Sequence, residues 1–153
     1  MRLQWPPVCV AVLLANSAYA QAEEISNLEK IERSAFIPAK LAQQQIDEIK
    51  EALAHGSCLE VAEWVKYPFA IRTNGRAERL LFADSAFCRD FPAIFKRERI
   101  EAFLSQSLEE TARADGGFYF WKSGLAVQAE CPKFLDLECR DSDLQLRIKS
   151  VDL

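Results

Sequence analysis

The spacing of the apolar residues changes along the chain, and the change predicts an order of helices and strands. Over residues 41–54 the apolar positions recur every three or four residues, which is the spacing of one helix face. Gly56 follows, where a helix can end. A second helical segment is predicted over residues 58–66, and Pro68 prevents it from continuing.

A β-hairpin is predicted next. Two extended segments, residues 67–73 and 77–83, flank the pair Asn74-Gly75. Both positions of a tight hairpin turn need a positive φ angle, which asparagine and glycine tolerate better than other residues. The hairpin is therefore expected to turn at this dipeptide.

Two further helices follow the predicted hairpin. The first would begin with Asp84 or Ser85 as its N-cap, and Pro92 would divide it or start a new turn. The second, residues 97–112, is amphipathic, with apolar residues on one side at Ile100, Phe103, Leu104 and Leu108. We expect the glycine pair at 116–117 to end it.

The C-terminal third has the two-residue period of a half-buried sheet. Segments 117–122, 125–130 and 144–151 are predicted strands, and Ser123-Gly124 allows a turn between the first two. Helices, a hairpin, two more helices and a terminal antiparallel meander together predict an α+β domain, with helices packed on the sheet.

The first twenty residues have the organisation of an export signal. Arg2 is followed by an apolar run over residues 8–15, and Ala18 and Ala20 are the small residues that a signal peptidase reads. The run is about half of the ~20 residues needed to span a bilayer. We therefore predict a signal peptide over 1–20, an N-terminal arm or short helix over 21–40, and one domain over 41–153, periplasmic or secreted, with no membrane anchor after cleavage.

The charge balance limits the class of partner. Removal of residues 1–20 leaves 133 of the 153 residues. Arg2 is the one charged residue that is removed, so 18 basic and 23 acidic side chains remain, with a net charge of −5. Nucleic acids and anionic membranes attract basic surfaces, so neither is expected as a partner. Apolar residues form 50% of the chain, which is typical of a folded domain and not of disorder.

Four cysteines remain after removal of the signal: Cys58, Cys88, Cys131 and Cys139. An even number in an exported chain indicates two disulfides, for which three pairings exist. We favour Cys131–Cys139, because its loop is short and lies between two predicted strands, and this leaves Cys58–Cys88. No pair has the spacing of zinc ligands, so no metal or other cofactor is expected.

Residues 61–69 (VAEWVKYPF), the hairpin, and the aromatic residues at 87, 91 and 95 resemble exported bacterial domains of the nuclear transport factor 2-like (cystatin-like) superfamily. The order of elements is similar over about 41–151, and the residue match is sharpest over 58–95. The resemblance implies a curved antiparallel sheet around helices, forming a cone with a possible pocket. This superfold includes enzymes, transport adaptors and inhibitor or immunity modules, so it assigns no activity by itself.

Aromatic and arginine side chains on the predicted strands are the candidate binding residues. Alternate residues of a strand face opposite sides, so either Phe118 and Phe120 or Tyr119 and Trp121 face the core. The amphipathic pair Tyr119 and Trp121 is better suited to a solvent-facing position or the mouth of a pocket, where such rings anchor partners. Packing of these rings into the core, or over the edge of the sheet, is the alternative. Arg79 is a further candidate on the hairpin. The residues predicted to bind a partner or ligand are Tyr67, Arg72, Tyr119 and Trp121.

The acid/base candidates do not form a complete catalytic group. Glu63 is the alternative general base, because a buried carboxylate with a raised pKa could act beside Tyr67. Asp84 suits a helix cap, Asp90 a solvated surface, and His55 a helix C-terminus. No catalytic residue is therefore assigned.

These observations favour an exported, non-catalytic binding domain, such as an inhibitor or immunity-type protein for a cell-envelope partner, or a domain that holds a small ligand. The negative net charge would suit a basic partner. The alternatives are a small pocket enzyme of the isomerase or hydratase type, and a structural accessory protein of the envelope.

Overall fold

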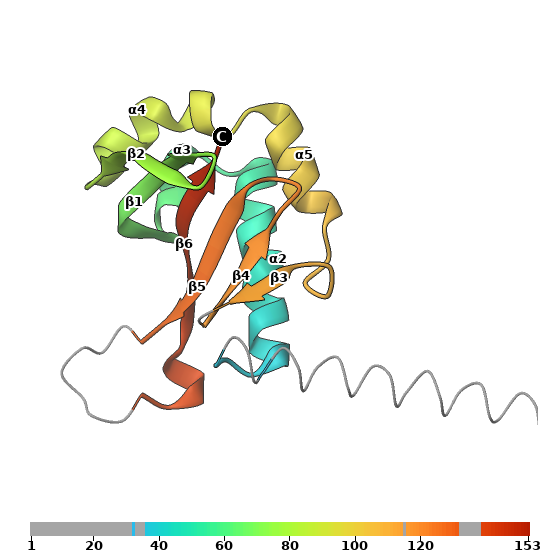
Figure 1. The fold of residues 1–153 in the computed structure, drawn as a ribbon. Helices are drawn as coiled ribbons and strands as arrows, with labels where there is room; N and C mark the ends of the chain where they lie inside the picture. The colour runs from blue at the N-terminus through green and yellow to red at the C-terminus, as the bar shows by residue number, and fades with distance from the viewer. Residues whose placement is uncertain (1–31, 33–35, 115, 132–138) are drawn as a thin grey trace, which may run out of the picture.

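The chain folds with its helices on one side of a mixed six-stranded sheet (Figure 1). The computed structural model describes residues 32, 36–114, 116–131 and 139–153. The predicted signal peptide over 1–20 and most of the predicted arm over 21–40 lie outside the described residues. The end of that arm joins the fold, because Ile37 is fully buried and the first described helix begins at Ala39.

The sheet has the strand order β2-β1-β6-β5-β4-β3. Its strands are β1 (Val65–Thr73), β2 (Arg76–Leu81), β3 (Ala112–Ala114), β4 (Gly117–Phe120), β5 (Leu125–Glu130) and β6 (Gln145–Asp152). β1 and β6 run parallel, whereas the other neighbours are antiparallel. The predicted α+β class is confirmed, but the sheet is mixed and not purely antiparallel, because β6 inserts between the hairpin and the meander.

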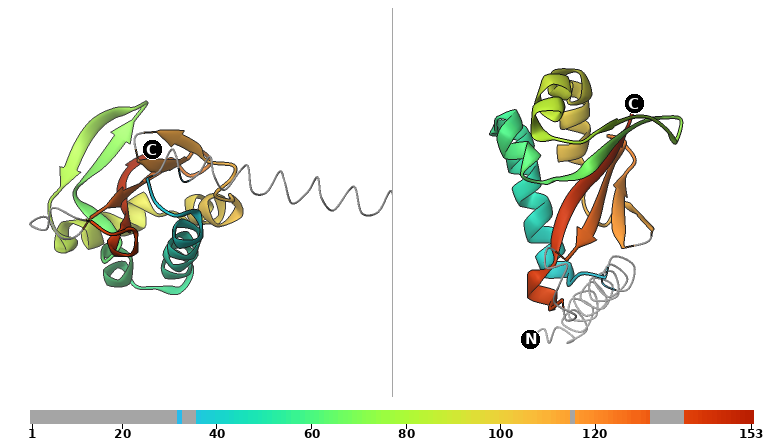
Figure 2. Two further views of the ribbon diagram at one scale, coloured as in Figure 1. Left: turned by 90° about the horizontal axis from the view of Figure 1, so that it is seen from below. Right: turned by 90° about the vertical axis from the view of Figure 1, so that its left-hand side faces the viewer.

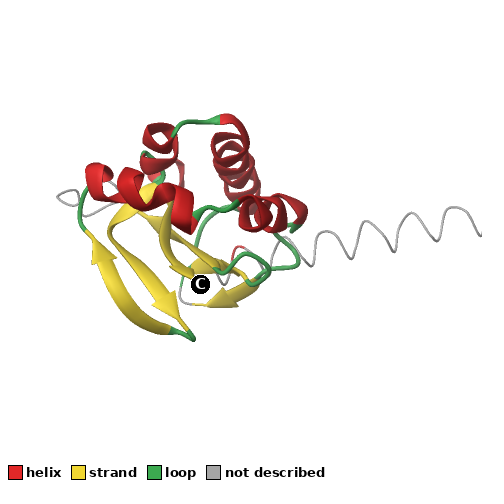
Figure 3. Cartoon of the chain, turned by 90° about the horizontal axis from the view of Figure 1, so that it is seen from above, coloured by secondary structure: helices red, strands yellow, loops and turns green. Residues whose placement is uncertain are grey.

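The helices are α2 (Ala39–His55), α3 (Cys58–Ala62), α4 (Asp84–Ile94) and α5 (Arg97–Ser105), with a 3-10 turn, η1 (Asp141–Asp143), before β6. α2 to α5 lie on one side of the sheet and leave the other side open (Figures 2 and 3). We call the side without helices the uncovered face. The covered face supplies the core, whose largest fully buried side chains are Phe69, Phe87, Phe103, Phe118, Phe120, Ile37, Ile46, Ile49, Leu125, Leu146 and Ile148.

The predicted hairpin is confirmed. β1 and β2 pair with Thr73 opposite Arg76, and the turn residues Asn74 and Gly75 have φ angles of 51° and 77°. Both φ angles lie in the left-handed region, which Asn74 and Gly75 were expected to adopt.

Two predicted helices end earlier than expected. α3 stops at Ala62, because the backbone at Trp64 and Val65 joins the sheet and Ile148 donates to the Trp64 carbonyl. α5 stops at Ser105, although Leu108 is buried as its spacing suggested. Sheet pairing and tertiary contacts thus override the local helical period at both places.

Lys50 and Gln106 explain the end of α5. The Lys50 ammonium on α2 donates to the carbonyl oxygens of Leu104 (3.3 Å) and Gln106 (2.8 Å), which have no helical partner at this terminus. The fully buried Gln106 side chain donates to the Glu110 carbonyl and accepts from the Lys122 backbone N–H. Residues 106–111 are therefore held in place without being helical.

The start of α4 also differs from the prediction. Asp84 is the first helical residue, Ala83 occupies the N-cap position, and no side chain caps the helix there. Asp84 still lies in the first turn, where a carboxylate is favoured by the helix dipole. Pro92 lies inside the single helix and does not divide it.

Both favoured disulfides are present. Cys58 on α3 bonds to Cys88 on α4, and Cys131 bonds to Cys139. The first closes a sequence separation of 30 residues and the second a separation of 8. The loop between Cys131 and Cys139, residues 132–138, lies outside the described residues.

Gln45 joins α2 to the start of β6, and its loss should be costly. Its amide donates to the Leu144 carbonyl (3.0 Å) and accepts from the Leu146 N–H (2.6 Å), in a site where Gln45 is only 8% exposed. We expect Gln45→Ala to lower the free energy of unfolding by about 2 kcal/mol, because two backbone groups lose their partners. Urea unfolding followed by circular dichroism measures this.

Gln44 provides the matched control. It is the preceding residue of the same helix and is exposed, and its side-chain amide donates to the Glu48 carboxylate. Gln44→Ala should change the unfolding free energy by less than about 0.5 kcal/mol. Equal losses in the two variants would show that the bridge to β6 contributes nothing specific.

Candidate functional site

The uncovered face carries a row of small side chains that crosses the sheet. The register places Leu80, Ala70, Ser150, Ala126 and Tyr119 opposite one another on β2, β1, β6, β5 and β4. Their strand neighbours Phe69, Leu81, Phe118, Leu125 and Val127 all belong to the core, so the row points away from it. Small side chains therefore occupy the middle of this row, and the larger Leu80 and Tyr119 lie at its two ends.

A β-bulge at Lys149 shapes the centre of the row. Ala126 and Val127 are consecutive on β5, yet they pair with Ser150 and Ile148, so Lys149 is the extra residue on β6. The bulge changes the parity of the strand, which brings Ser150 to the uncovered face and returns Val151 to the core. A lysine and a serine therefore follow each other on the same face.

A hollow of about 230 Å³ lies on the uncovered face beside this bulge. We call it the sheet hollow. It is lined from four strands by Arg72, Gly117, Phe118, Tyr119, Ala126, Val127, Gln128, Lys149 and Ser150. Gly117 is on the same face as Tyr119, and a β-carbon there would lie 2.4 Å from the Val127 carbonyl oxygen. The close approach of β4 and β5 therefore requires glycine at this position.

A second hollow of about 460 Å³ shares Tyr119 with the first. Its lining includes Trp121, Arg99, Lys122 and Asp152. The Asp152 carboxylate accepts the Gly75 N–H of the hairpin turn (3.0 Å). Burial lowers the pKa of Arg99, against the attraction of Asp152. We call this the tryptophan hollow.

Trp121 is exposed but fixed in position. The residue is 57% exposed, while its indole N–H donates to the Glu110 carbonyl at 3.1 Å. The Lys122 ammonium lies 5.4 Å from the ring centroid and 3.6 Å from the Glu110 carboxylate. An immobilised aromatic ring loses little conformational entropy when a partner covers it, so this geometry suits an anchor residue.

Three of the four predicted binding residues come together. Arg72, Tyr119 and Trp121 surround the two adjoining hollows, although Arg72 is far from the other two in sequence. The predicted outward orientation of Tyr119 and Trp121 is confirmed, since Phe118 and Phe120 are buried. Tyr67 does not line either hollow.

Tyr67 instead lies on the covered face of β1, where it packs against the core. Burial raises the pKa of its hydroxyl, and the Asp84 carboxylate acts in the same direction. A phenol with a raised pKa stays protonated at neutral pH. The structure therefore gives Tyr67 a packing role and separates it from the predicted binding group.

Glu63 does not have the surroundings of a general base. Its side chain is exposed just after α3, and its carbonyl accepts from Arg147. It lines a surface hollow of about 360 Å³ with Trp64, Gln145 and Arg147, and not a closed apolar cavity beside Tyr67. The buried carboxylate that the enzymatic alternative requires is therefore not found at Glu63, because only the apolar side of α3 faces the core.

The remaining titratable candidates have structural positions. Asp90 is not solvated as expected: its side chain is 13% exposed and pairs with Arg79 at 2.6 Å, which links α4 to β2. Arg79 therefore lies on the covered side of the hairpin. His55 is exposed in the last turn of α2, which confirms its interpretation as a helix-end residue.

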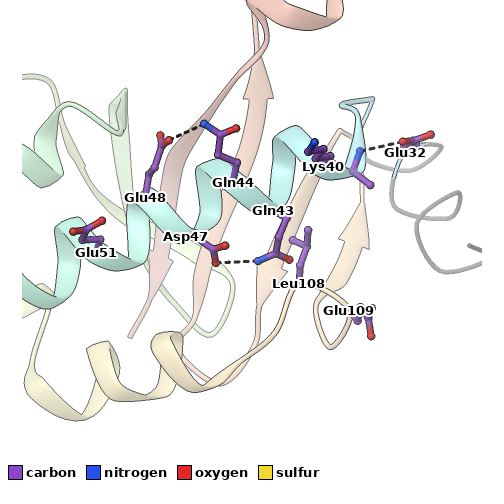
Figure 4. Close-up of a pocket in the computed structure, with 10 residues that line it drawn as sticks. Glu32, Lys40, Gln43, Gln44, Asp47, Glu48, Glu51, Leu108 and Glu109 are labelled. Atoms are coloured by element: carbon purple, nitrogen blue, oxygen red, sulfur yellow. Dashed lines mark hydrogen bonds between the residues drawn. The ribbon is translucent and has the colours of Figure 1, made fainter. Parts of the chain in front are cut away.

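An acidic hollow on the helix side was missed by sequence reasoning. It measures about 820 Å³ and lies along the outer side of α2 (Figure 4). Its lining contains Lys40 and five carboxylate side chains, Glu32, Asp47, Glu48, Glu51 and Glu109. The polar face of α2 was visible in the sequence, but the contribution of Glu109 depends on the irregular segment after α5. The negative charge thus gathers on the side opposite the sheet hollow.

Comparisons with models of known protein families, with curated proteins and with solved structures find no match to this chain. Within the described ranges, no group of three or more histidine, cysteine, aspartate or glutamate side chains could hold a metal ion. Among the same residues, no helix is long and apolar enough to cross a bilayer. The inference of function therefore depends on the geometry of the uncovered face.

Proposed function

We propose that this protein is an exported, non-catalytic binding domain that contacts a cell-envelope partner through the uncovered face of its sheet. The observation that carries the proposal is the meeting of Arg72, Tyr119 and Trp121 around the two adjoining hollows. Exposed aromatic rings beside an arginine are the residue types that most often dominate binding energy at protein interfaces.

The covalent structure supports export. Two disulfides form and persist in oxidising compartments, and both are present here. The predicted signal peptide over residues 1–20 would deliver the chain to such a compartment, periplasmic or extracellular.

The arrangement of elements supports the resemblance to the nuclear transport factor 2-like superfamily. A helix pair precedes a hairpin, two helices follow it, and the last strand lies beside the first. Inhibitor and immunity modules are among the roles that this resemblance implies. In this reading the protein acts by occupying a surface of its partner.

The expectation of a basic partner needs a local correction. The negative side chains gather along α2, whereas the described lining of the sheet hollow carries Arg72 and Lys149 and no carboxylate. A partner on the uncovered face meets aromatic and cationic groups, so net charge is a poor guide to this interface.

Trp121→Ala should weaken partner binding strongly without unfolding the protein. We expect the dissociation constant to rise at least about thirtyfold, because the variant removes a central aromatic anchor. Affinity capture from envelope extract, followed by calorimetry with the purified partner, measures this. Leu59→Ala, which removes an exposed apolar side chain (61% exposed) of α3 on the helix side, should bind like the unaltered protein. If Trp121→Ala binds the partner as tightly as Leu59→Ala and the unaltered protein do, the uncovered face is excluded as the interface.

A further inference from the structure

We propose that the sheet hollow is a binding site for a single anionic group, a carboxylate or a phosphate, held between Arg72 and Lys149. This inference rests on the proposed function, because it names the chemistry of what the same face receives. It is carried by the charges of the lining, by an arginine nitrogen without a partner, and by the bulge on β6.

The described lining of the sheet hollow has two positive charges and no negative one. Arg72 and Lys149 are the ionised side chains among the residues that line it. The chain as a whole carries more acidic than basic residues. Two cationic side chains and no carboxylate in the lining of one hollow therefore differ from the average composition of the chain. An anion entering the hollow meets attraction from both sides.

Arg72 has hydrogen-bonding capacity that the described residues do not use. Its Nε atom is buried and has no hydrogen-bond partner among them. Asp152 on β6 is paired with Arg72 of β1. The Asp152 carboxylate accepts the Gly75 N–H and attracts the Arg99 guanidinium electrostatically. A buried donor without a partner costs free energy, and an arginine beside a hollow can recover that cost by binding an oxyanion.

The bulge gives the site its room. A regular strand would have placed residue 150 in the core and Val151 on the uncovered face, beside Lys149. Because of the bulge, Ser150 and Ala126 form a low floor between Arg72 and Tyr119, and Lys149 stands next to it. The volume of about 230 Å³ suits one anionic group and its attached carbons.

Titration of the full-length protein with acetate and with inorganic phosphate tests the inference. Both disulfides are kept intact, and chloride holds the ionic strength constant. Saturable changes are expected in the amide resonances of Tyr119, Ala126 and Ser150, whereas the neutral isostere acetamide should cause none. Lys149→Gln and Arg72→Gln should each weaken binding about tenfold or more, because each removes a charged donor. Lys149→Arg should retain it.

Lys96→Gln is the matched control, because it removes an exposed lysine at the start of α5, on the helix side. It should bind both anions like the unaltered protein. Equal weakening by Lys96→Gln, an equal response to acetamide, or no saturable change at the three amides would overturn the proposal. Circular dichroism and thermal melting verify that the variants are folded, and Lys149 is exposed, so its variant does not depend on core packing.

Capture of the partner by the same variants identifies the source of the anion. If Lys149→Gln and Arg72→Gln lose both the anions and the partner, the group is an acidic side chain of that partner. If they lose the anions alone, the hollow takes a free small molecule. Partner capture that depends on Trp121, without any anion binding, would overturn this inference and leave the proposed function standing.

Discussion

Phe87→Ala should be the most destabilising single substitution among the aromatic residues of the helix side. Phe87 is fully buried, and its ring centroid lies 5.4 Å from that of Phe69, 5.7 Å from Phe91 and 5.9 Å from Phe95. Truncation removes the apolar burial and leaves a cavity between β1 and α4, so we expect a loss of about 4 kcal/mol in unfolding free energy. Equilibrium unfolding in guanidinium chloride measures it.

The same substitution at Phe82 isolates the contribution of burial. Phe82 lies after β2 and is 70% exposed, so Phe82→Ala should cost less than about 1 kcal/mol. A loss below about 2 kcal/mol for Phe87→Ala would mean that the aromatic cluster repacks around the missing ring and that the core is less rigid than its geometry indicates.

Removal of the Cys58–Cys88 bond should have the second largest effect. The bond closes a separation of 30 residues that contains the whole hairpin, so its loss restores a large amount of chain entropy to the unfolded state. For a loop of this size we expect a loss of about 3.5 kcal/mol in the double variant Cys58→Ala/Cys88→Ala. Thermal unfolding of the oxidised protein and of the double variant gives the difference.

The second disulfide supplies the internal comparison. Cys131–Cys139 closes a separation of 8 residues, for which the same entropy argument gives about 2.5 kcal/mol. Cys131→Ala/Cys139→Ala should therefore destabilise less than removal of the first bond. The reverse order would indicate that the ring of residues between Cys131 and Cys139 contributes to folding in ways that loop length does not describe.

Much of the fold could be predicted from local signals in the sequence. Asn74-Gly75 located the hairpin because only a few residues accept the left-handed backbone of its turn. The alternation over residues 118–121 separated buried Phe118 and Phe120 from exposed Tyr119 and Trp121. Both disulfide pairings could be predicted because the compartment and a short loop constrained the choice.

Features that depend on distant parts of the chain could not be predicted. The parallel pairing of β1 with β6 and the early ends of α3 and α5 are set by contacts far along the sequence, such as Ile148 with Trp64 and Lys50 with Gln106. For the site, Tyr119, Trp121 and Arg72 were predicted from residue type and face. The position of Lys149 beside these three residues was not predicted. It depends on the bulge in β6, and that bulge is set by the pairing of β6 with β1 and β5.

The central position of β6 has a consequence for how the molecule is made. β6 is the last described strand in chain order, yet it connects the hairpin to the meander within the sheet. A ribosome must therefore have synthesised residue 152 before the two halves of the sheet can join, and until then each half presents an open edge. Completion of the sheet therefore has to follow translation of that strand.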